Sequence, residues 1–363
     1  MPFWNKILLL VFFVGISLIT IILVYKFKPV SLKDNNSKTL VNKNIPEKTN
    51  KNNFESTLSI DYIKSLKIES SAPVIESQLN SGVNYSRYIA SYKSEGNKIY
   101  GLLAIPNSTI PEKGYPAIIF VHGYIPPKSY KTEEKYVSYV DSLAKAGFVV
   151  FKIDLRGHGN SEGVASGTYF SNGYTIDTLN AFSSLQKLEQ VNKQNIGIWG
   201  HSMAGNIVLR TMLVNNNIKA GVIWAGAVYS YKDFAKYGLN DSSYVPNTNI
   251  PTPESKNANN IKIHEEILKF RANRNSVNFD NDFWNSISLT NNIKYLTKPI
   301  LINHAIDDKV VNINYSKDLV EVLKQNNKEY EYNEYKTGGH NIEEPSYTPA
   351  MQRTIDFFKL YLD

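Results

Sequence analysis

The sequence predicts an α/β fold, in which a mostly parallel, doubly wound sheet is led by an antiparallel hairpin and preceded by a transmembrane helix. Three observations support this prediction. Short apolar runs alternate with helical patterns over most of the 363 residues, the first two strand patterns are joined by a tight turn, and a charge-free apolar segment stands near the start of the chain.

The strand predictions rest on two kinds of pattern. Residues 87–93 and 98–105 alternate in the manner of strands and are separated by Ser94-Glu95-Gly96-Asn97, which indicates a hairpin. Later runs are short and continuously apolar, as expected of parallel strands that are buried on both faces. They predict strands at 117–121, 148–153, 196–199, 220–224 and 300–303, and a further strand is predicted at 329–335.

Helices are predicted between these strands. Apolar residues recur with helical spacing through 132–146, and further helices are predicted at 177–188 and 204–213. Residues 231–284 break this rhythm, because they are polar, contain three prolines and hold only a short helical stretch around 264–270. We interpret them as a small cap insertion between two strands of the sheet.

An N-terminal membrane anchor is predicted in residues 1–28. Ile7 to Tyr25 form 19 residues without a charge, and a helix of that length spans about 28 Å, close to the hydrocarbon thickness of a bilayer. A cleaved signal peptide would have a shorter apolar region followed by small residues, whereas Lys26 and Lys28 follow here. A cleaved signal and a buried core helix stay open as alternatives.

Residues 29–57 are predicted to be a disordered linker, since 15 of the 21 residues from 33 to 53 are Asn, Lys, Ser or Thr. Lysines after the anchor favour a cytoplasmic body by the positive-inside rule, but long domains translocate largely regardless of charge. An N-terminal anchor before a long domain is also typical of export. We therefore expect a single-pass protein whose domain, residues 58–363, is extracytoplasmic.

The composition excludes several kinds of site and partner. The chain has no cysteine, so disulfides, thiolate zinc sites and a cysteine nucleophile are impossible. Of the net charge of +7, residues 1–57 carry +5, which leaves the body nearly balanced and argues against a nucleic-acid partner. No paired-histidine motif is present, and we expect neither a metal nor a cofactor.

One serine stands in a motif that carries chemistry. Residues 196–205 read IGIWGHSMAG, a strand that ends in Gly-His-Ser and leads at once into a helix, as in a nucleophile elbow. The turn is so tight that small residues are needed two before and two after the serine. Gly200 meets this need, while Ala204 replaces the usual glycine and adds a methyl group that we expect to be tolerated.

A serine hydroxyl needs a base, and the base needs a third group to orient it. In this type of sheet these groups follow in the order Ser, Asp, His at the carboxyl ends of successive strands. Asp307 and Asp308 follow the strand at 300–303, and His340 stands on a glycine loop after the last strand. The order is met, with either aspartate able to serve as the acid.

Five stretches together carry a resemblance to a known family. Residues 85–360 resemble the α/β-hydrolase catalytic domain of the prolyl oligopeptidase family and its acyl-peptidase and esterase relatives. The stretches are FVHGY (120–124), DLRGHGNSEG (154–163), GHSMAG (200–205), HAIDDKVV (304–311) and GGH (338–340). Only about 60 residues separate the predicted anchor from the first hairpin, too few for the propeller domain of true prolyl oligopeptidases.

The resemblance implies a role for several residues. Ser202 matches the nucleophile and His340 the general base. In relatives the acid stands three residues after the glycine of a His-Gly-x-x-Asp stretch. Ala305 takes the place of that glycine, so Asp308 matches the acid and Asp307 is the alternative.

The resemblance also implies the surroundings of the reacting group. The backbone N–H groups of Met203 and Tyr124 would bind the oxyanion of the tetrahedral intermediate. Selectivity is expected from the cap insertion and from the loop after Tyr124, and we name Ile125 and Trp224 as candidates for the substrate pocket.

Other notable side chains are assigned structural roles. Arg156 is expected to tie loops together, with a clamp for a substrate carboxylate as the alternative, and His264 is expected to be solvated. Four histidines at strand ends are expected to bond backbone groups rather than transfer protons: His122, His158, His201 and His304.

These observations predict a membrane-anchored serine hydrolase that cleaves small peptide amide or ester substrates through an acyl-enzyme on Ser202. A carboxylesterase of the same fold is an alternative, because the two chemistries share one acyl-enzyme route. A non-catalytic binding module is an alternative of another class, supported only by Ala204 and Ala305 in place of glycine.

Overall fold

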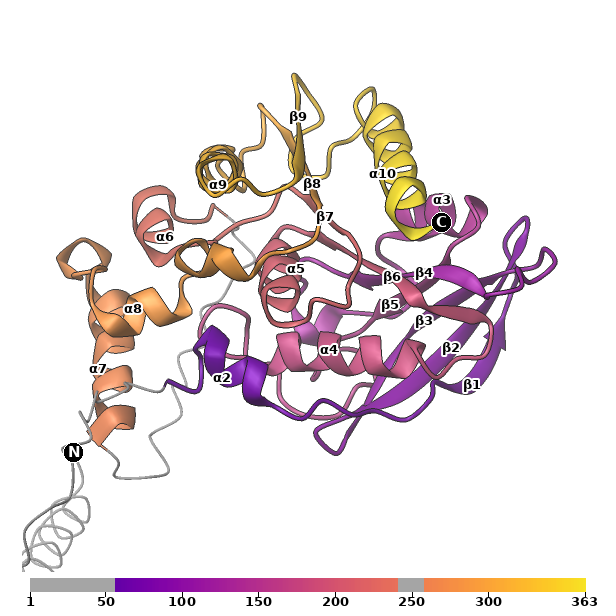
Figure 1. The fold of residues 1–363 in the computed structure, drawn as a ribbon, viewed down its shortest axis with the longest axis horizontal. Coiled ribbons are helices and arrows are strands. Elements are labelled where there is room, and N and C mark those ends of the chain that lie inside the picture. Colours follow the sequence, from indigo (N-terminus) through magenta and orange to yellow (C-terminus); the bar gives the residue numbers. More distant parts are fainter. Residues whose placement is uncertain (1–55, 241–257) are drawn as a thin grey trace, which may run out of the picture. The chain divides into compact units, whose positions relative to one another are not determined.

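A nine-stranded sheet is the centre of the computed structural model, which describes residues 56–240 and 258–363 (Figure 1). The strand order is β1-β2-β3-β5-β4-β6-β7-β8-β9. The strands are β1 (Val74–Leu79), β2 (Tyr85–Ser94), β3 (Asn97–Pro106), β4 (Tyr115–Val121), β5 (Val149–Ile153), β6 (Val191–His201), β7 (Gly221–Trp224), β8 (Ile300–Ala305) and β9 (Tyr330–Tyr335).

The pairing confirms a mostly parallel sheet led by an antiparallel hairpin. Strands β2 and β3 pair antiparallel around the predicted turn, and β3 pairs antiparallel with β5. All pairs from β5 through β4 to β9 are parallel. Strand β1, an exposed edge strand, was not anticipated, because its side chains show almost no burial pattern.

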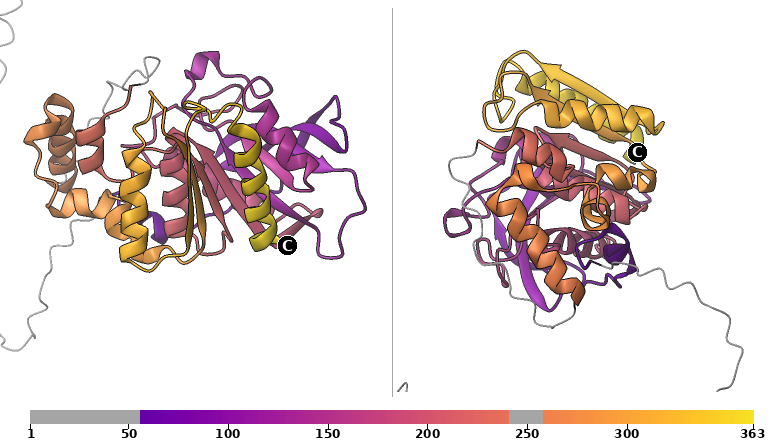
Figure 2. Two further views of the ribbon diagram at one scale, coloured as in Figure 1. Left: turned by 90° about the horizontal axis from the view of Figure 1, so that it is seen from above. Right: turned by 90° about the vertical axis from the view of Figure 1, so that its left-hand side faces the viewer.

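Helices cover both faces of the sheet. Helices α3 and α10 pack on one face, and α4, α5 and α9 pack on the other (Figure 2). The α-helices are α2 (Ile60–Ser65), α3 (Val137–Lys145), α4 (Gly173–Leu185), α5 (Met203–Val214), α6 (Tyr231–Tyr237), α7 (Ala258–Ala272), α8 (Asp282–Ile287), α9 (Asn314–Gln325) and α10 (Tyr347–Leu362). Short 3-10 helices are η1 (Pro127–Ser129), η2 (Arg274–Ser276) and η3 (Thr290–Tyr295).

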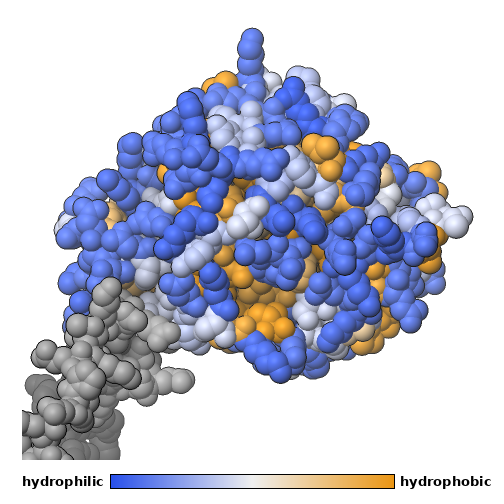
Figure 3. All heavy atoms as spheres, viewed as in Figure 1, coloured by the Kyte–Doolittle hydropathy of each residue, from blue (hydrophilic) through white to orange (hydrophobic). Residues whose placement is uncertain are grey.

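The central strands contribute to two separate cores. On β4, Ile119 and Val121 face the cluster under α4 and α5, whereas Ile118 and Phe120 face the cluster under α3 and α10. Successive side chains of a strand point to opposite faces, so a strand covered on both sides must be apolar throughout. Hydrophilic residues cover most of the face seen in Figure 3, with hydrophobic ones visible between them.

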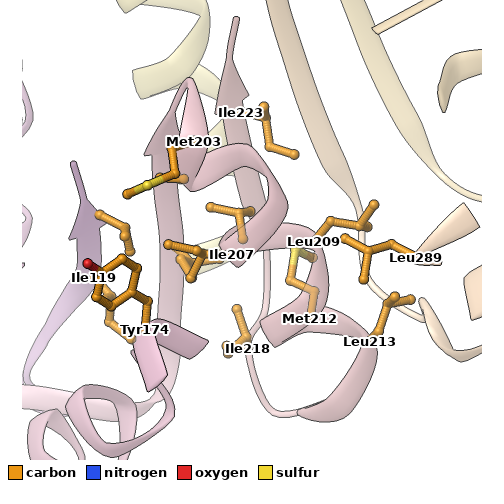
Figure 4. Close-up of a cluster of buried hydrophobic side chains, with 14 of the residues drawn as sticks. Ile119, Tyr174, Met203, Ile207, Leu209, Met212, Leu213, Ile218, Ile223 and Leu289 are labelled. Atoms are coloured by element: carbon orange, nitrogen blue, oxygen red, sulfur yellow. The ribbon is translucent and has the colours of Figure 1, made fainter. Parts of the chain in front are cut away.

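Helix α5, which follows the serine motif, is held firmly. Its residues from Met203 to Leu213 are all buried, and the cluster around it includes Ile119, Ile218 and Leu289 (Figure 4). Full burial of a side chain such as Leu or Ile stabilises the fold by about 1.5–3 kcal/mol. The start of this helix is therefore fixed relative to the sheet.

The insertion at 231–284 contains α6, α7 and the start of α8 among its described residues. Helices α7 and α8 are joined by Glu266, whose carboxylate accepts hydrogen bonds from Trp284 Nε1 (2.9 Å) and Asn281 Nδ2 (3.0 Å). His264, expected to be solvated, is half-buried on α7.

The predicted membrane anchor, Ile7 to Tyr25, lies outside the described residues, as does most of the predicted linker. Among the residues that are described, no helix is long and apolar enough to cross a membrane. Ser56 and Thr57, predicted as the end of the linker, instead contact the domain: Ser56 is buried, and the carbonyl of Thr57 accepts a hydrogen bond from Asn172.

Candidate active site

The serine motif forms the sharp turn that its spacing predicts. Ser202 lies between β6 and α5 with φ 56° and ψ −119°, a strained conformation for a residue other than glycine. A Cβ atom at Gly200 would lie 2.7 Å from Val208 Cγ2 and 2.9 Å from Ala204 Cβ. Position 200 therefore requires glycine, and the methyl group of Ala204 is tolerated because Gly200 leaves room for it.

His340 and Asp308 meet at the carboxyl ends of β8 and β9. His340 Nδ1 lies 2.8 Å from Asp308 Oδ2, and the Asp308 side chain is fully buried. The neighbouring Asp307 instead accepts a hydrogen bond from the backbone N–H of Gly339 at 2.8 Å. Asp308 is thus the aspartate that contacts the imidazole, and Asp307 supports the loop that carries it.

Asp308 is surrounded by hydrogen-bond donors. Its Oδ1 accepts from the backbone N–H groups of Val310 (2.8 Å) and Val311 (3.0 Å), and its Oδ2 also contacts His304 Nε2 at 3.1 Å. Burial alone would raise the pKa of Asp308, but the hydrogen bonds from His304 and His340 outweigh it and hold this pKa well below its usual range. Asp308 is a carboxylate at neutral pH.

Ser202 and His340 line one cavity of about 660 Å³. No hydrogen bond joins their side chains in the part of the chain that the structure describes, a common finding in sites without substrate. Their segments are nevertheless adjacent, because the ring of His201 lies 4.6 Å from that of His340. The cavity is lined by Gly123, Tyr124, Ile125, Lys135, Tyr136, Ser138, Tyr139, His201, Ser202, Val310, His340, Asn341, Glu343, Glu344 and Tyr347.

The backbone groups expected to bind an oxyanion also lie at this cavity or beside it. Met203 is the first residue of α5, so its N–H has no acceptor within the helix and stands at the positive end of the helix dipole. Tyr124 lines the cavity on the loop after β4.

The two predicted pocket residues differ in their positions. Ile125 lines the cavity, as expected. Trp224 does not: it is fully buried at the end of β7, and its indole N–H donates to Thr354 Oγ1 at 3.1 Å. Trp224 is therefore a core residue. The sequence does not show whether an apolar side chain at the end of a central strand points into the core or toward the cavity.

The described lining shows which segments border the cavity. None of the described residues of the 231–284 insertion lines the cavity. Most of the described lining comes from the loop after β4, the start of α3, and His340 with the segment that follows it. Three tyrosines of the cavity wall were not predicted: Tyr136, Tyr139 and Tyr347. The only local signal was the helical spacing of apolar residues through 132–146, which includes Tyr136 and indicates a buried face.

The remaining histidines contact backbone or structural groups. His122 Nδ1 lies 2.7 Å from Gly123 O, and His158 Nδ1 lies 3.2 Å from Arg156 O. Burial lowers the pKa of His122 to about 3, so it stays neutral. His304 has a role that the sequence did not suggest, since it contacts Asp308 directly.

Arg156 ties loops together. Its guanidinium pairs with Asp177 on α4 (2.7 Å) and with Glu95 in the hairpin turn (2.9 Å). It does not line the cavity, so the alternative of a substrate clamp is not supported. Within residues 56–240 and 258–363, no three His, Asp or Glu side chains are arranged so that they could hold a metal ion.

Comparisons with known proteins find similarity in sequence and in fold. A family model described as serine aminopeptidase, S33, matches residues 114–344. The human protein ABHD12B is 24% identical over 211 residues, which are 58% of this chain and 51% of that relative, so the chain spans about half the length of this relative.

Solved structures show the likeness of fold. The acylaminoacyl peptidase of Pyrococcus horikoshii aligns with a TM-score of 0.58 and 19% identity over 77% of this chain and 42% of that one. An acetyl xylan esterase from Paenibacillus sp. R4 aligns with a TM-score of 0.60 and 17% identity over 87% of this chain and 97% of that one.

Proposed function

The chain belongs to the serine aminopeptidase (S33) family and is a serine hydrolase, and on this premise we propose that it cleaves small peptide amides or esters through an acyl-enzyme on Ser202. The observation that carries the proposal is the 2.8 Å contact between His340 Nδ1 and Asp308 Oδ2 at the cavity that Ser202 lines. Because a carboxylate only accepts, His340 donates its Nδ1 proton to Asp308 and leaves Nε2 free to act as a base.

The reaction follows from these roles. His340 Nε2 takes the proton of Ser202 as Oγ attacks the substrate carbonyl, and the same proton then passes to the departing amine or alcohol as the C–N or C–O bond breaks. Water adds to the acyl-enzyme by the reverse sequence and releases the acid. The backbone N–H groups of Met203 and Tyr124 stabilise the oxyanion, each by about 3–4 kcal/mol.

The cavity walls support a peptide substrate with a free amino group. Glu343 and Glu344 line the cavity and are exposed to solvent. Carboxylates attract an ammonium group, and Lys135, which also lines the cavity, offsets the attraction of the two carboxylates only in part. A small ester is the second candidate, because acetyl xylan esterases share this fold over most of the chain.

Covalent labelling tests the proposal. A fluorophosphonate should label the full-length protein and fail to label Ser202→Ala, while Ser86→Ala on β2 should label as the wild type does. A folded wild-type protein that remains unlabelled would favour the non-catalytic binding module instead.

Substrate comparison separates the two candidates. Aminoacyl and dipeptidyl amides should be cleaved better than short acyl esters, and the double substitution Glu343→Gln/Glu344→Gln should raise KM for the amides alone. Preference for esters, with KM unchanged in the double variant, would favour the carboxylesterase.

We further propose that Ile7 to Tyr25 anchors the protein in a bilayer as a single-pass helix with an extracytoplasmic domain. The support is the length and the absence of charge in this segment. After cell breakage the protein should stay in the membrane fraction under alkaline carbonate and enter solution only with detergent, and protease added outside intact cells or spheroplasts should reach the domain. Release by carbonate would contradict the anchor.

A further inference from the structure

A chain of hydrogen bonds outside Ser202, Asp308 and His340 links the three segments of the site. Tyr136, at the start of α3, contacts both the loop after β4 and the serine turn. Its hydroxyl lies 2.9 Å from Gly123 N and 2.8 Å from His201 Nδ1. His201 Nε2 in turn lies 2.8 Å from the backbone carbonyl of His340.

The partners determine the direction of every bond in this chain. A carbonyl oxygen only accepts, so His201 Nε2–H donates to His340 O. A neutral imidazole then has Nδ1 as its acceptor, which receives the Tyr136 hydroxyl proton, while the Tyr136 oxygen accepts the Gly123 N–H. Burial lowers the pKa of His201 to about 3, which keeps this tautomer neutral over the working range of pH.

The surrounding structure leaves little room for another arrangement. A Cβ atom at Gly123 would lie 2.7 Å from the Tyr136 hydroxyl and 3.1 Å from His201 Nδ1. Tyr136 itself has φ 62° and ψ 25°, a left-handed conformation that a tyrosine adopts only when its surroundings hold it there. Its ring packs edge-on against Phe120 and Trp199.

These hydrogen bonds join the segments whose relative positions matter during the reaction. Gly123 precedes Tyr124, one of the expected oxyanion donors, and His201 precedes Ser202. The loop that carries His340 contains Gly338 and Gly339, both with positive φ, and Asp307 accepts the N–H of Gly339 at 2.8 Å. Asp308 orients the His340 ring, and His201 holds the His340 backbone.

We propose that Tyr136 and His201 are positioning residues that lock the oxyanion loop and the base-bearing loop to the serine turn. This inference rests on the proposed function, in which Ser202 and His340 react. Loss of either link lets Tyr124 or His340 shift relative to Ser202, and small shifts of reacting groups cost large factors in rate.

The test uses the full-length protein with Tyr136→Phe, His201→Phe and both together, and measures the rate of fluorophosphonate labelling together with kcat and KM. Each single variant should lose about 10- to 100-fold in labelling rate and in kcat, with KM within about threefold. Because the two side chains act through one chain of bonds, the double variant should be no slower than the slower single variant.

Two comparisons separate positioning from damage to the fold. Tyr85→Phe removes another buried tyrosine hydroxyl bonded to α3, through Asp141 at 2.8 Å, and should leave the labelling rate unchanged. His201→Gln keeps an N–H that can reach His340 O and should recover part of the rate lost in His201→Phe. Circular dichroism checks that each variant is folded.

The outcomes are distinct. Labelling rates within about twofold of wild type in both single variants, or losses that multiply in the double variant, would overturn the inference and leave the proposed function intact. A change confined to KM would overturn it as well. A wild-type protein that is not labelled at Ser202 would overturn the proposed function and this inference with it.

Discussion

Two buried aspartates stand at carboxyl ends of the sheet and behave in opposite ways. Asp308 follows β8 and Asp154 follows β5, and both side chains are completely buried. The pKa of Asp308 lies well below its usual range, whereas burial raises the pKa of Asp154 to about 6. Burial of the side chain therefore does not by itself determine whether a carboxyl group in this fold is charged.

The donors around each group explain the difference. Asp308 receives bonds from two imidazoles and two backbone N–H groups. Asp154 receives bonds from the hydroxyls of Tyr130 (2.8 Å) and Thr132 (2.5 Å), with the buried Lys152 nearby. Fixed N–H donors favour the carboxylate strongly, while a hydroxyl can turn to accept from a protonated acid. Asp308 is therefore a carboxylate that orients the base His340, whereas Asp154 stabilises the loop that carries Tyr130 and Thr132.

The largest expected effect comes from exchanging each carboxylate for an amide. Asp308→Asn should lower kcat by roughly 10⁴-fold, because an amide N–H can turn His340 into the wrong tautomer. Asp154→Asn should lower kcat by less than about tenfold, since Asp154 does not line the cavity. Steady-state kinetics at pH 7 measure both. A kcat for Asp308→Asn within tenfold of wild type would remove Asp308 from the site, and Asp307→Asn would then be tested in its place.

The second prediction concerns stability and pH. Because the folded-state pKa of Asp154 is raised to about 6, the folded protein keeps a proton that the unfolded chain releases near pH 4, so this group costs stability as pH rises from about 4 to 6. The free energy of unfolding of wild type minus that of Asp154→Asn should fall by about 2–3 kcal/mol between pH 4 and pH 7, measured by urea unfolding.

Asp308 should show the opposite sign in another window. Its lowered pKa stabilises the fold above about pH 4, and this contribution is lost as pH falls further. The free energy of unfolding of wild type minus that of Asp308→Asn should therefore stay nearly constant from pH 4 to pH 7. Parallel curves for the two variants would show that the environments of the two aspartates are alike after all.

A third, smaller effect is expected at His304, which donates to Asp308 and lies 2.7 Å from Ser316 Oγ. His304→Leu should lower kcat by about tenfold, since Asp308 loses one of the donors that orient it. Ser316→Ala removes only the hydroxyl that supports His304 and should change kcat less. Equal losses in the two variants would indicate general disruption of the loop rather than loss of a donor to Asp308.

The smallest effect is expected at Thr132. Thr132→Val removes one hydroxyl donor from Asp154 and should lower the free energy of unfolding by about 1 kcal/mol at pH 7. The value of kcat should not change, because Thr132 does not line the cavity. Thermal unfolding and the standard turnover assay check both parts. A loss of kcat would mean that the hydrogen bonds of Asp154 also hold the part of the loop after β4 that lines the cavity.

The parts of the fold that could be predicted are those with local signals. The strand at 117–121 is apolar on both faces and the strand at 148–153 is apolar except for Lys152, and the structure has them as β4 and β5. Strand β1 and helix α2 escaped prediction, since a short exposed edge strand and a six-residue helix have little periodicity. Trp224 was misplaced because alternation along a strand does not say which face borders a cavity.

The sequence by itself determined where most strands lie along the chain and the strained backbone at Ser202, because alternation, glycine spacing and the tight turn act within a few residues of one another. Only the tertiary structure decided that Asp308 rather than Asp307 contacts His340, that the described part of the insertion leaves the cavity walls to other segments, and that Tyr136 bridges Gly123 and His201. Such contacts join segments that are far apart along the chain. They are set by how the layers pack, and no local pattern encodes the separation of two side chains across a sheet edge.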